Sequence, residues 1–244
     1  MKLTALIFAL GTTTAASLAG VSTTVVDFED GMLHGWDGPQ GIGGATTIDN
    51  TAGVGGGAGL RTQFNNFGID FDNSTNSAFT GDFSGFDEVT VSFDLRIDQI
   101  GTFLPVGRPF LLELRSNSLA QGGYPWASAY FLFDWYGADS FNGFTTLSTT
   151  LDPSSMVLPA GWGGFGAEDP NTFEPILPDG VTFADILANV DEMAITTILP
   201  GFFFTFDDYD VTLDNITIST TSVPAPTALA LLGLGGMVGT RRRR

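Results

Sequence analysis

The chain has 244 residues, of which 27 are acidic, nine are basic and none is cysteine, and its formal net charge is −18. The absence of cysteine excludes disulfide bridges, thiolate metal sites and thiol nucleophiles. The negative charge argues against nucleic acid or anionic lipid as a partner of the folded part, because both require a cationic surface.

The first residues have the pattern of an export signal. Lys2 precedes an apolar run from Leu3 to Leu10, and Ser17-Leu18-Ala19 supplies the small residues that suit signal peptidase. We therefore expect a signal helix in residues 1–19, with cleavage after Ala19.

Alternating apolar and polar residues predict an all-β domain over residues 20–221. The clearest run is Val89–Asp98, in which every second residue is apolar, as in a strand that is buried on one face. Further strands are expected at Phe110–Arg115, Ala129–Tyr136 and Met193–Ile198, and an aromatic-rich strand pair closes the domain. A domain of this length can bury a core without disulfides.

Three other segments break this pattern. Gly41–Gly59 contains eight glycines and is interpreted as a surface loop. Asp70–Asn76 lacks the glycine and glutamate of an EF-hand loop and is interpreted as a polar turn. Thr182–Val190 predicts one short helix, because Thr182 can cap it, Asp185 follows three residues later, and an apolar stripe runs along one side.

The C-terminal segment, residues 222–244, has three parts. Pro224 and Pro226 precede the apolar run Thr227–Gly239, and Arg241–Arg244 end the chain. The thirteen residues of the run are few for a membrane span, which needs about 20, and the arginines would stay on the cytoplasmic side. Without Lys2 and these four arginines, four bases face all 27 acids, a formal charge of −23.

This order of parts resembles the PEP-CTERM sorting signal of Gram-negative bacteria. In that family a Pro-Glu-Pro box, a hydrophobic helix and an arginine-rich end are recognised and cut by an exosortase. The matching residues here are Pro224, Pro226, Arg241, Arg242, Arg243 and Arg244. Ala225 stands in place of the glutamate, which leaves open a variant sorting enzyme or none. The resemblance implies signal peptidase and an exosortase-type enzyme as partners, with transient or permanent membrane insertion through residues 227–239.

A second resemblance covers most of residues 25–218. Its motifs are D-F-E-D-G at 27–31, F-T-G-D-F-S-G-F-D at 79–87, V-S-F-D-L-R at 91–96, T-F-A-D-I-L-A-N-V at 182–190 and L-D-N-I at 213–216. In this order they resemble the laminin B domain and carbohydrate-binding-module-like jelly rolls. The resemblance implies a jelly-roll, galactose-binding-like β-sandwich that serves in adhesion or matrix, and it fixes no ligand.

A structural Ca²⁺ site is one hypothesis for the acidic residues. In a jelly roll the first and last strands lie side by side, which would place Asp27, Glu29 or Asp30 near Asp214, and Ca²⁺ prefers such oxygen ligands. The apolar alternation also changes phase at Asp214-Asn215, which predicts a bulge that re-aims Asp214. In modules of the family the ligands correspond to Glu29 and Asp214. The alternative is solvated carboxylates that protect a sheet edge.

Aromatic residues between 124 and 136 are candidates for stacking on sugar rings. Strand alternation predicts that Phe131, Phe133 and Trp135 point into the core, which leaves Tyr130, Asp134 and Tyr136 on the other face as glycan contacts. Core packing of the whole group is the alternative.

Taken together, these features predict an exported, surface-sorted, non-catalytic protein, located at the cell surface or in the extracellular matrix and associated with polysaccharide. The one histidine lies in a glycine-rich turn, and G-x-S-x-G and H-E-x-x-H are absent. One alternative is a structural coat or adhesion protein without glycan affinity. The other is a secreted glycoside hydrolase, for which two positioned carboxylates suffice.

Overall fold

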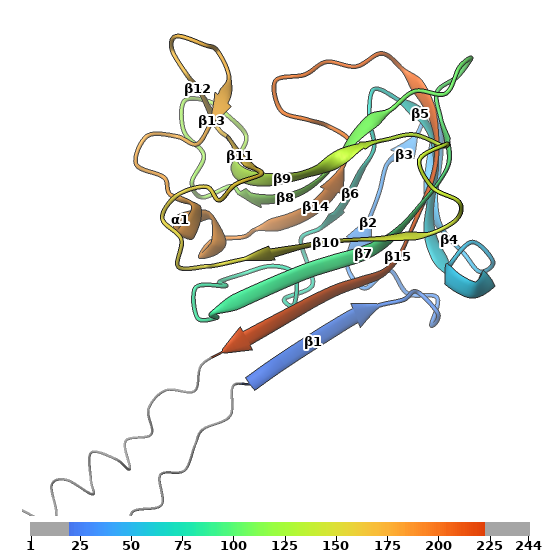
Figure 1. Ribbon diagram of the computed structural model, residues 1–244, viewed down its shortest axis with the longest axis horizontal. Coiled ribbons are helices and arrows are strands. Elements are labelled where there is room, and N and C mark those ends of the chain that lie inside the picture. The colour runs from blue at the N-terminus through green and yellow to red at the C-terminus, as the bar shows by residue number, and fades with distance from the viewer. Residues whose placement is uncertain (1–19, 223–244) are drawn as a thin grey trace, which may run out of the picture. The chain divides into compact units, whose positions relative to one another are not determined.

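The computed structural model describes residues 20–222 (Figure 1). The expected signal helix and apolar C-terminal helix lie outside this range, as do Pro224, Pro226 and the four arginines 241–244. Residues 21–222 form one compact unit. Within the described range, no helix combines the length and the apolar character that crossing a membrane requires.

Two sheets stack face to face (Figure 1). The seven-stranded sheet has the order β10-β7-β15-β5-β4-β3, and β1 also pairs with β15. Its strands are β1 (Gly20–Val26), β3 (Gln40–Gly41), β4 (Gly44–Asp49), β5 (Gly59–Asn66), β7 (Glu88–Ile100), β10 (Thr145–Leu151) and β15 (Asp207–Ser222).

The six-stranded sheet has the order β11-β9-β8-β14-β6-β2. Its strands are β2 (Trp36–Asp37), β6 (Asp70–Asn73), β8 (Arg108–Ser116), β9 (Ala127–Tyr136), β11 (Trp162–Phe165) and β14 (Glu192–Thr196). A separate ribbon pairs β12 (Ala167–Glu168) with β13 (Pro175–Ile176).

The strand order establishes jelly-roll topology. The eight main strands are, in chain order, β5, β6, β7, β8, β9, β10, β14 and β15. The first, third, sixth and eighth form one sheet, and the second, fourth, fifth and seventh form the other. Each strand is therefore followed by one in the other layer, except that β8 and β9 form a hairpin in the same sheet, as in the two Greek keys of a jelly roll. The predicted all-β jelly-roll sandwich with one short helix is confirmed.

The core lies between the two sheets because each contributes one apolar face. In β7, Val89, Val91, Phe93, Leu95 and Ile97 are all buried and alternate with half-buried polar residues, as predicted. The ring of Phe93 packs edge-on against Phe133 of the opposite sheet, with centroids 5.4 Å apart.

The predicted helix and bulge are both present. Helix α1 (Phe183–Leu187) begins with a capping box in which Thr182 and Asp185 satisfy each other's backbone amides. In β15, the register against β7 shifts between Asp214 and Thr217, and Asn215 has a φ of 49°. The shift lets Leu213 and Ile216, which are an odd number of residues apart, both lie in the core.

Three expectations need correction. Gly41–Gly59 is not a loop, because it contains β4 and the 3₁₀ turn η1 (Val54–Gly56). Asp70–Asn73 is the strand β6 rather than a turn. The closing strand pair is a single 16-residue strand, β15, and the phenylalanines at 202–206 form the loop before it.

Candidate functional site

The outward face of the six-stranded sheet holds buried charges. All nine residues of β8 are buried. Leu112 and Leu114 belong to the core between the sheets, so the intervening Glu113 and Arg115 point away from it. Glu113 and Arg115 are nevertheless only 3% and 6% exposed. Charged side chains are rarely buried without partners, which makes their surroundings informative.

Arg115 is the centre of a network of acids from three strands. Its guanidinium pairs with Glu113 at 2.7 Å, with Asp70 of β6 at 2.8 Å and with Glu192 of β14. It also lies 4.8 Å from the centre of the Trp126 ring. We call this group the outer-face cluster. Its members are Asp70, Asp72, Glu113, Arg115, Trp126, Tyr130 and Glu192.

Glu113 is satisfied on both carboxylate oxygens. Trp126 donates its Nε1 hydrogen to Oε1 at 3.2 Å, and the Ser128 hydroxyl donates to the same atom. The Nε of Arg115 donates to Oε2 at 2.9 Å. A buried carboxylate with this many donors is held in one position.

The side of the cluster formed by β6 has excess negative charge. Burial raises the pKa of Asp72 to about 6, and the nearby charges of Glu192 and Asp70 act in the same direction. One oxygen of Asp70, Oδ1, is buried without a hydrogen-bond partner. The carboxylates of Asp70 and Asp72 are themselves partly exposed, so this side presents negative charge and acceptor oxygens at the surface.

Tyr130 borders the cluster on β9. It lies opposite Glu113 of β8 and Gly163 of β11, and it is half-buried. A Cβ atom placed on Gly163 would come within 2.3 Å of the Tyr130 ring, so glycine there makes room for the tyrosine. Burial, and then the charges of Glu113 and Glu174, raise the pKa of Tyr130.

A bulge in β9 corrects the predicted orientation of its aromatic residues. The register against β8 slips near Phe133, and the alternation of β9 reverses after it. Tyr136 packs on the core, with its ring against Phe110 and Phe141, whereas Trp135 is 45% exposed. The structure therefore does not bring Tyr136 to the face of Tyr130. Asp134 is exposed beside the bulge.

Of the four predicted calcium ligands, the structure brings Glu29 and Asp214 to one place. Both carboxylates hold the loop between β4 and β5. Ala58 donates its amide hydrogen to Glu29 at 2.9 Å, and Val54 donates to Asp214 at 2.8 Å. Burial raises the pKa of Asp214, and the charges of Asp94 and Glu29 oppose the lowering effect of the two amide donors.

Asp27 and Asp30 make local contacts instead. Asp27 accepts the amide hydrogen of Glu29, and Asp30 accepts that of Met32 and lies 2.9 Å from Nε2 of His34. Among residues 20–222, no three acidic or histidine side chains converge as a metal site. Backbone carbonyls would have to complete any calcium shell around Glu29 and Asp214.

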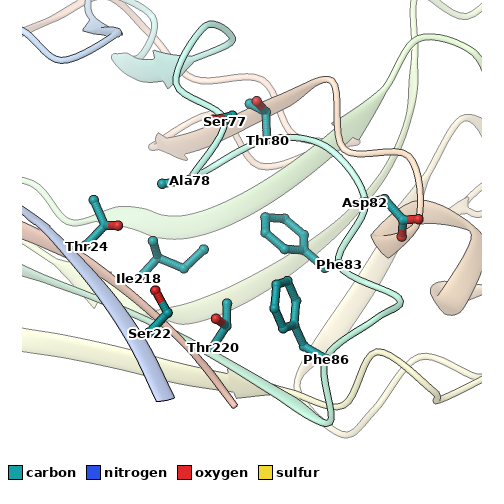
Figure 2. A pocket seen from close by; sticks show the side chains of 10 residues that line it. All are labelled: Ser22, Thr24, Ser77, Ala78, Thr80, Asp82, Phe83, Phe86, Ile218 and Thr220. Atoms are coloured by element: carbon teal, nitrogen blue, oxygen red, sulfur yellow. The ribbon is translucent and has the colours of Figure 1, made fainter. Parts of the chain in front are cut away.

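Away from the outer-face cluster, a concave feature that we call the lateral cleft opens beside β1 (Figure 2). It has a volume of about 250 Å³. The inward side of β1 carries hydroxyl groups there rather than apolar side chains, and two phenylalanine rings face them. The lining residues are Ser22, Thr24, Ser77, Ala78, Thr80, Asp82, Phe83, Phe86, Ile218 and Thr220.

Sequence reasoning missed most of the outer-face cluster. Asp70 and Asp72 were assigned to a turn, and Glu113 and Arg115 alternate with leucines in a way that is typical of a solvated strand face. The available signal was that alternation: one strand carries both an acid and a base at successive outward positions. It identifies a charged face but not the strands that lie beside it.

No family model and no curated protein matches the chain. Among solved structures, an exo-β-agarase has 14% identity and a TM-score of 0.48, over 85% of this chain and 26% of the agarase chain. The Clostridium thermocellum xylanase 10B modules have 12% identity and a TM-score of 0.42, over 84% of this chain and 28% of theirs. A family 30 carbohydrate-binding module has 13% identity and a TM-score of 0.40, over 76% of this chain and 91% of the module.

The chain thus spans about a quarter of the agarase and xylanase chains. These identities and TM-scores are too low to transfer a ligand or an activity. The jelly-roll assignment rests on the strand order of this chain.

Proposed function

We propose that the domain binds polysaccharide without cleaving it, at the outer-face cluster. The observation that supports this is the pairing of two half-buried aromatic residues, Trp126 and Tyr130, with the partly exposed carboxylates around Arg115, which belong to Asp70, Asp72 and Glu192. Sugar sites combine aromatic surface for the ring with fixed acceptors and donors for the hydroxyl groups. The Arg115 network holds these groups in place.

The test is the affinity of the exported chain for a panel of neutral and acidic polysaccharides, measured by pull-down and calorimetry. Tyr130→Ala and Trp126→Ala should each weaken binding at least about tenfold, because each removes an aromatic contact. Phe103→Ala is the control, since Phe103 is exposed in a distant loop.

Three outcomes would contradict the proposal in different ways. Loss of binding in Phe86→Ala but not in Tyr130→Ala would move the site to the lateral cleft. Release of reducing sugar that disappears in Asp72→Asn would indicate a glycoside hydrolase. No binding to any polysaccharide by the folded chain would favour the coat or adhesion alternative.

We also propose that the chain is exported, sorted to the cell surface and processed at both ends. The support is the sequence of residues 1–19 and 222–244. Mass spectrometry of the chain from its host should find Gly20 as the first residue and no Arg241–Arg244. An intact chain in the cytosol would contradict this.

We propose in addition that a structural Ca²⁺ ion joins Glu29 and Asp214 with carbonyl groups of the β4–β5 loop. The support is that both carboxylates meet this loop, and that left-handed backbone at Phe28 (φ 59°) and Asn215 (φ 49°) adjoins each of them. Such an ion would supply positive charge to a region that is otherwise acidic.

Thermal unfolding with and without Ca²⁺ tests this. The melting temperature should rise with Ca²⁺, and the rise should vanish in Glu29→Gln and Asp214→Asn but persist in the control Asp30→Asn. Equal curves with and without Ca²⁺ in the unmodified chain would remove the site.

A further inference from the structure

Four loops meet at one end of the sandwich. The register places the end of β5 beside the start of β15, the end of β7 beside the same strand, and the end of β9 beside the start of β8. The connections β5–β6, β7–β8, β9–β10 and β14–β15 therefore lie together. The β14–β15 loop crosses the top of the view in Figure 1, whereas the first and last described residues lie at the lower left.

These loops expose large apolar side chains. In the β14–β15 loop, Phe203 is fully exposed, Phe202 and Phe206 are 57% and 54% exposed, and Ile198 is 48% exposed. Phe67 and Trp135 join them at 53% and 45%. We call these six residues the aromatic end. Phe103 and Leu104 of the β7–β8 loop lie at the same end and are 95% and 75% exposed.

The aromatic end is ordered by its own contacts. The rings of Phe67 and Phe206 have centroids 3.9 Å apart, and Trp135 packs against Phe204 at 5.8 Å. The guanidinium of Arg108 lies over the Phe204 ring, 4.9 Å from its centre. Arg108 also forms a buried ion pair with Asp207, which neutralises its charge. The surface is therefore held in place by ring contacts and by a charge-balanced ion pair beneath Phe204.

The exposed area is that of a protein interface. A large aromatic side chain offers about 150–250 Å², so at these exposed fractions the six residues of the aromatic end expose about 600 Å² of apolar side chain, and about 900 Å² together with Phe103 and Leu104. Stable interfaces bury about 800 Å² on each partner, and a monomer rarely exposes a patch larger than a few hundred Å². The phenylalanine side chains have no polar group that could form a hydrogen bond with a sugar hydroxyl. This surface therefore fits an apolar partner better than a polyhydroxylated one.

We propose that the aromatic end is the contact surface for a second copy of this chain, in a two-fold symmetric, end-to-end dimer. A two-fold interface needs only one self-complementary patch, and the aromatic end together with Phe103 and Leu104 offers about the area that a stable interface buries on each partner. The formal charge of −23 on residues 20–222 opposes attachment to an anionic membrane. It also makes two copies repel, so the dimer should strengthen as salt screens the charge.

The position of the patch decides the geometry of the dimer. Strand β15 has 16 residues and begins beside the aromatic end, so its last residue lies up to about 50 Å away. An end-to-end dimer therefore places Ser222 of the two copies at opposite ends of the dimer. Such a dimer would link two copies whose C-terminal segments are attached to two surfaces that face each other. The proposal is independent of polysaccharide binding, which uses other residues.

A single-cysteine experiment tests the contact, because the chain has no cysteine of its own. Thr205→Cys, at an exposed position of the same loop that keeps every phenylalanine, should form a disulfide-linked dimer under mild oxidation of the exported full chain, and reductant should reverse it. Phe173→Cys is the control, since Phe173 is 73% exposed but lies between β12 and β13. Equal cross-linking of both variants, or none in Thr205→Cys, would overturn the proposal.

Sedimentation velocity provides a second measurement. The unmodified chain should dimerise more strongly at 0.5 M than at 0.05 M NaCl, and Phe203→Ser should weaken the dimer at least about tenfold. Polysaccharide affinity should be unchanged in Phe203→Ser. A monomeric chain that floats with phosphatidylcholine vesicles, and no longer floats as Phe203→Ser, would identify a lipid surface instead of a second copy.

Discussion

The outer-face cluster and the aromatic end depart in opposite ways from the usual distribution of side chains. The cluster places an arginine and a glutamate at 6% and 3% exposure, and the aromatic end leaves Phe203 fully exposed. Buried charges are costly unless each has partners, and exposed apolar groups remain costly until something covers them. In the first region, Arg115 and Glu113 find their partners within the chain. In the second region the exposed rings have no such partners among residues 20–222, which is why we assign the contact between two copies of the chain to it.

The largest expected effect concerns the internal partners of the cluster. Arg115→Ala should destabilise the fold by about 3–5 kcal/mol, because Glu113, Asp70 and Glu192 lose their common cation in a buried place. Urea unfolding measures this. The control Asp98→Asn, which breaks a more exposed pair with Arg96, should cost less than about 1 kcal/mol. Similar losses in both variants would mean that the network contributes no more than a surface pair.

An intermediate effect is expected from pH. Because burial raises the pKa of Asp72 to about 6, the folded chain holds this proton more tightly than the unfolded chain between about pH 4 and 6. The contribution of Asp72 to the free energy of unfolding therefore falls as pH rises through that window. Asp72→Asn should be more stable than the unmodified chain at pH 7.5, by about 1 kcal/mol after allowance for solvent screening.

Comparison of the two unfolding curves at pH 4 and pH 7.5 isolates this residue from the other carboxylates. The difference between Asp72→Asn and the unmodified chain should be small at pH 4. A difference that is the same at both pH values would show that Asp72 has an ordinary pKa.

The smallest effect on stability is expected at the aromatic end. Phe203→Ser should change the free energy of unfolding by less than about 0.5 kcal/mol under conditions in which the chain is monomeric, because the side chain is fully exposed. Phe93→Ala, at a buried phenylalanine, should cost about 3–5 kcal/mol. A large loss in Phe203→Ser would mean that the loop supports the fold rather than an interface.

The two regions also differ in how far the sequence predicts them. Alternation in β7 and the cap of α1 were predicted because both depend on neighbours in sequence. The cluster joins Asp70, Arg115 and Glu192, whose proximity depends on which strands pair, and a sequence pattern does not contain that information. In β9 one inserted residue reversed the orientation of Trp135 and Tyr136. The phenylalanines of the β14–β15 loop have strand-like composition, and only tertiary structure leaves them exposed.

The length of β15 has a mechanical consequence. It pairs with β7 over most of its 16 residues and is the last strand before residue 223. A force applied at its C-terminal end and resisted at the opposite loops would act along the strand, parallel to its axis. Its backbone hydrogen bonds lie across that axis, so they would share the load together rather than break one after another. The domain is therefore suited to transmit tension along β15 between the loop end and Ser222.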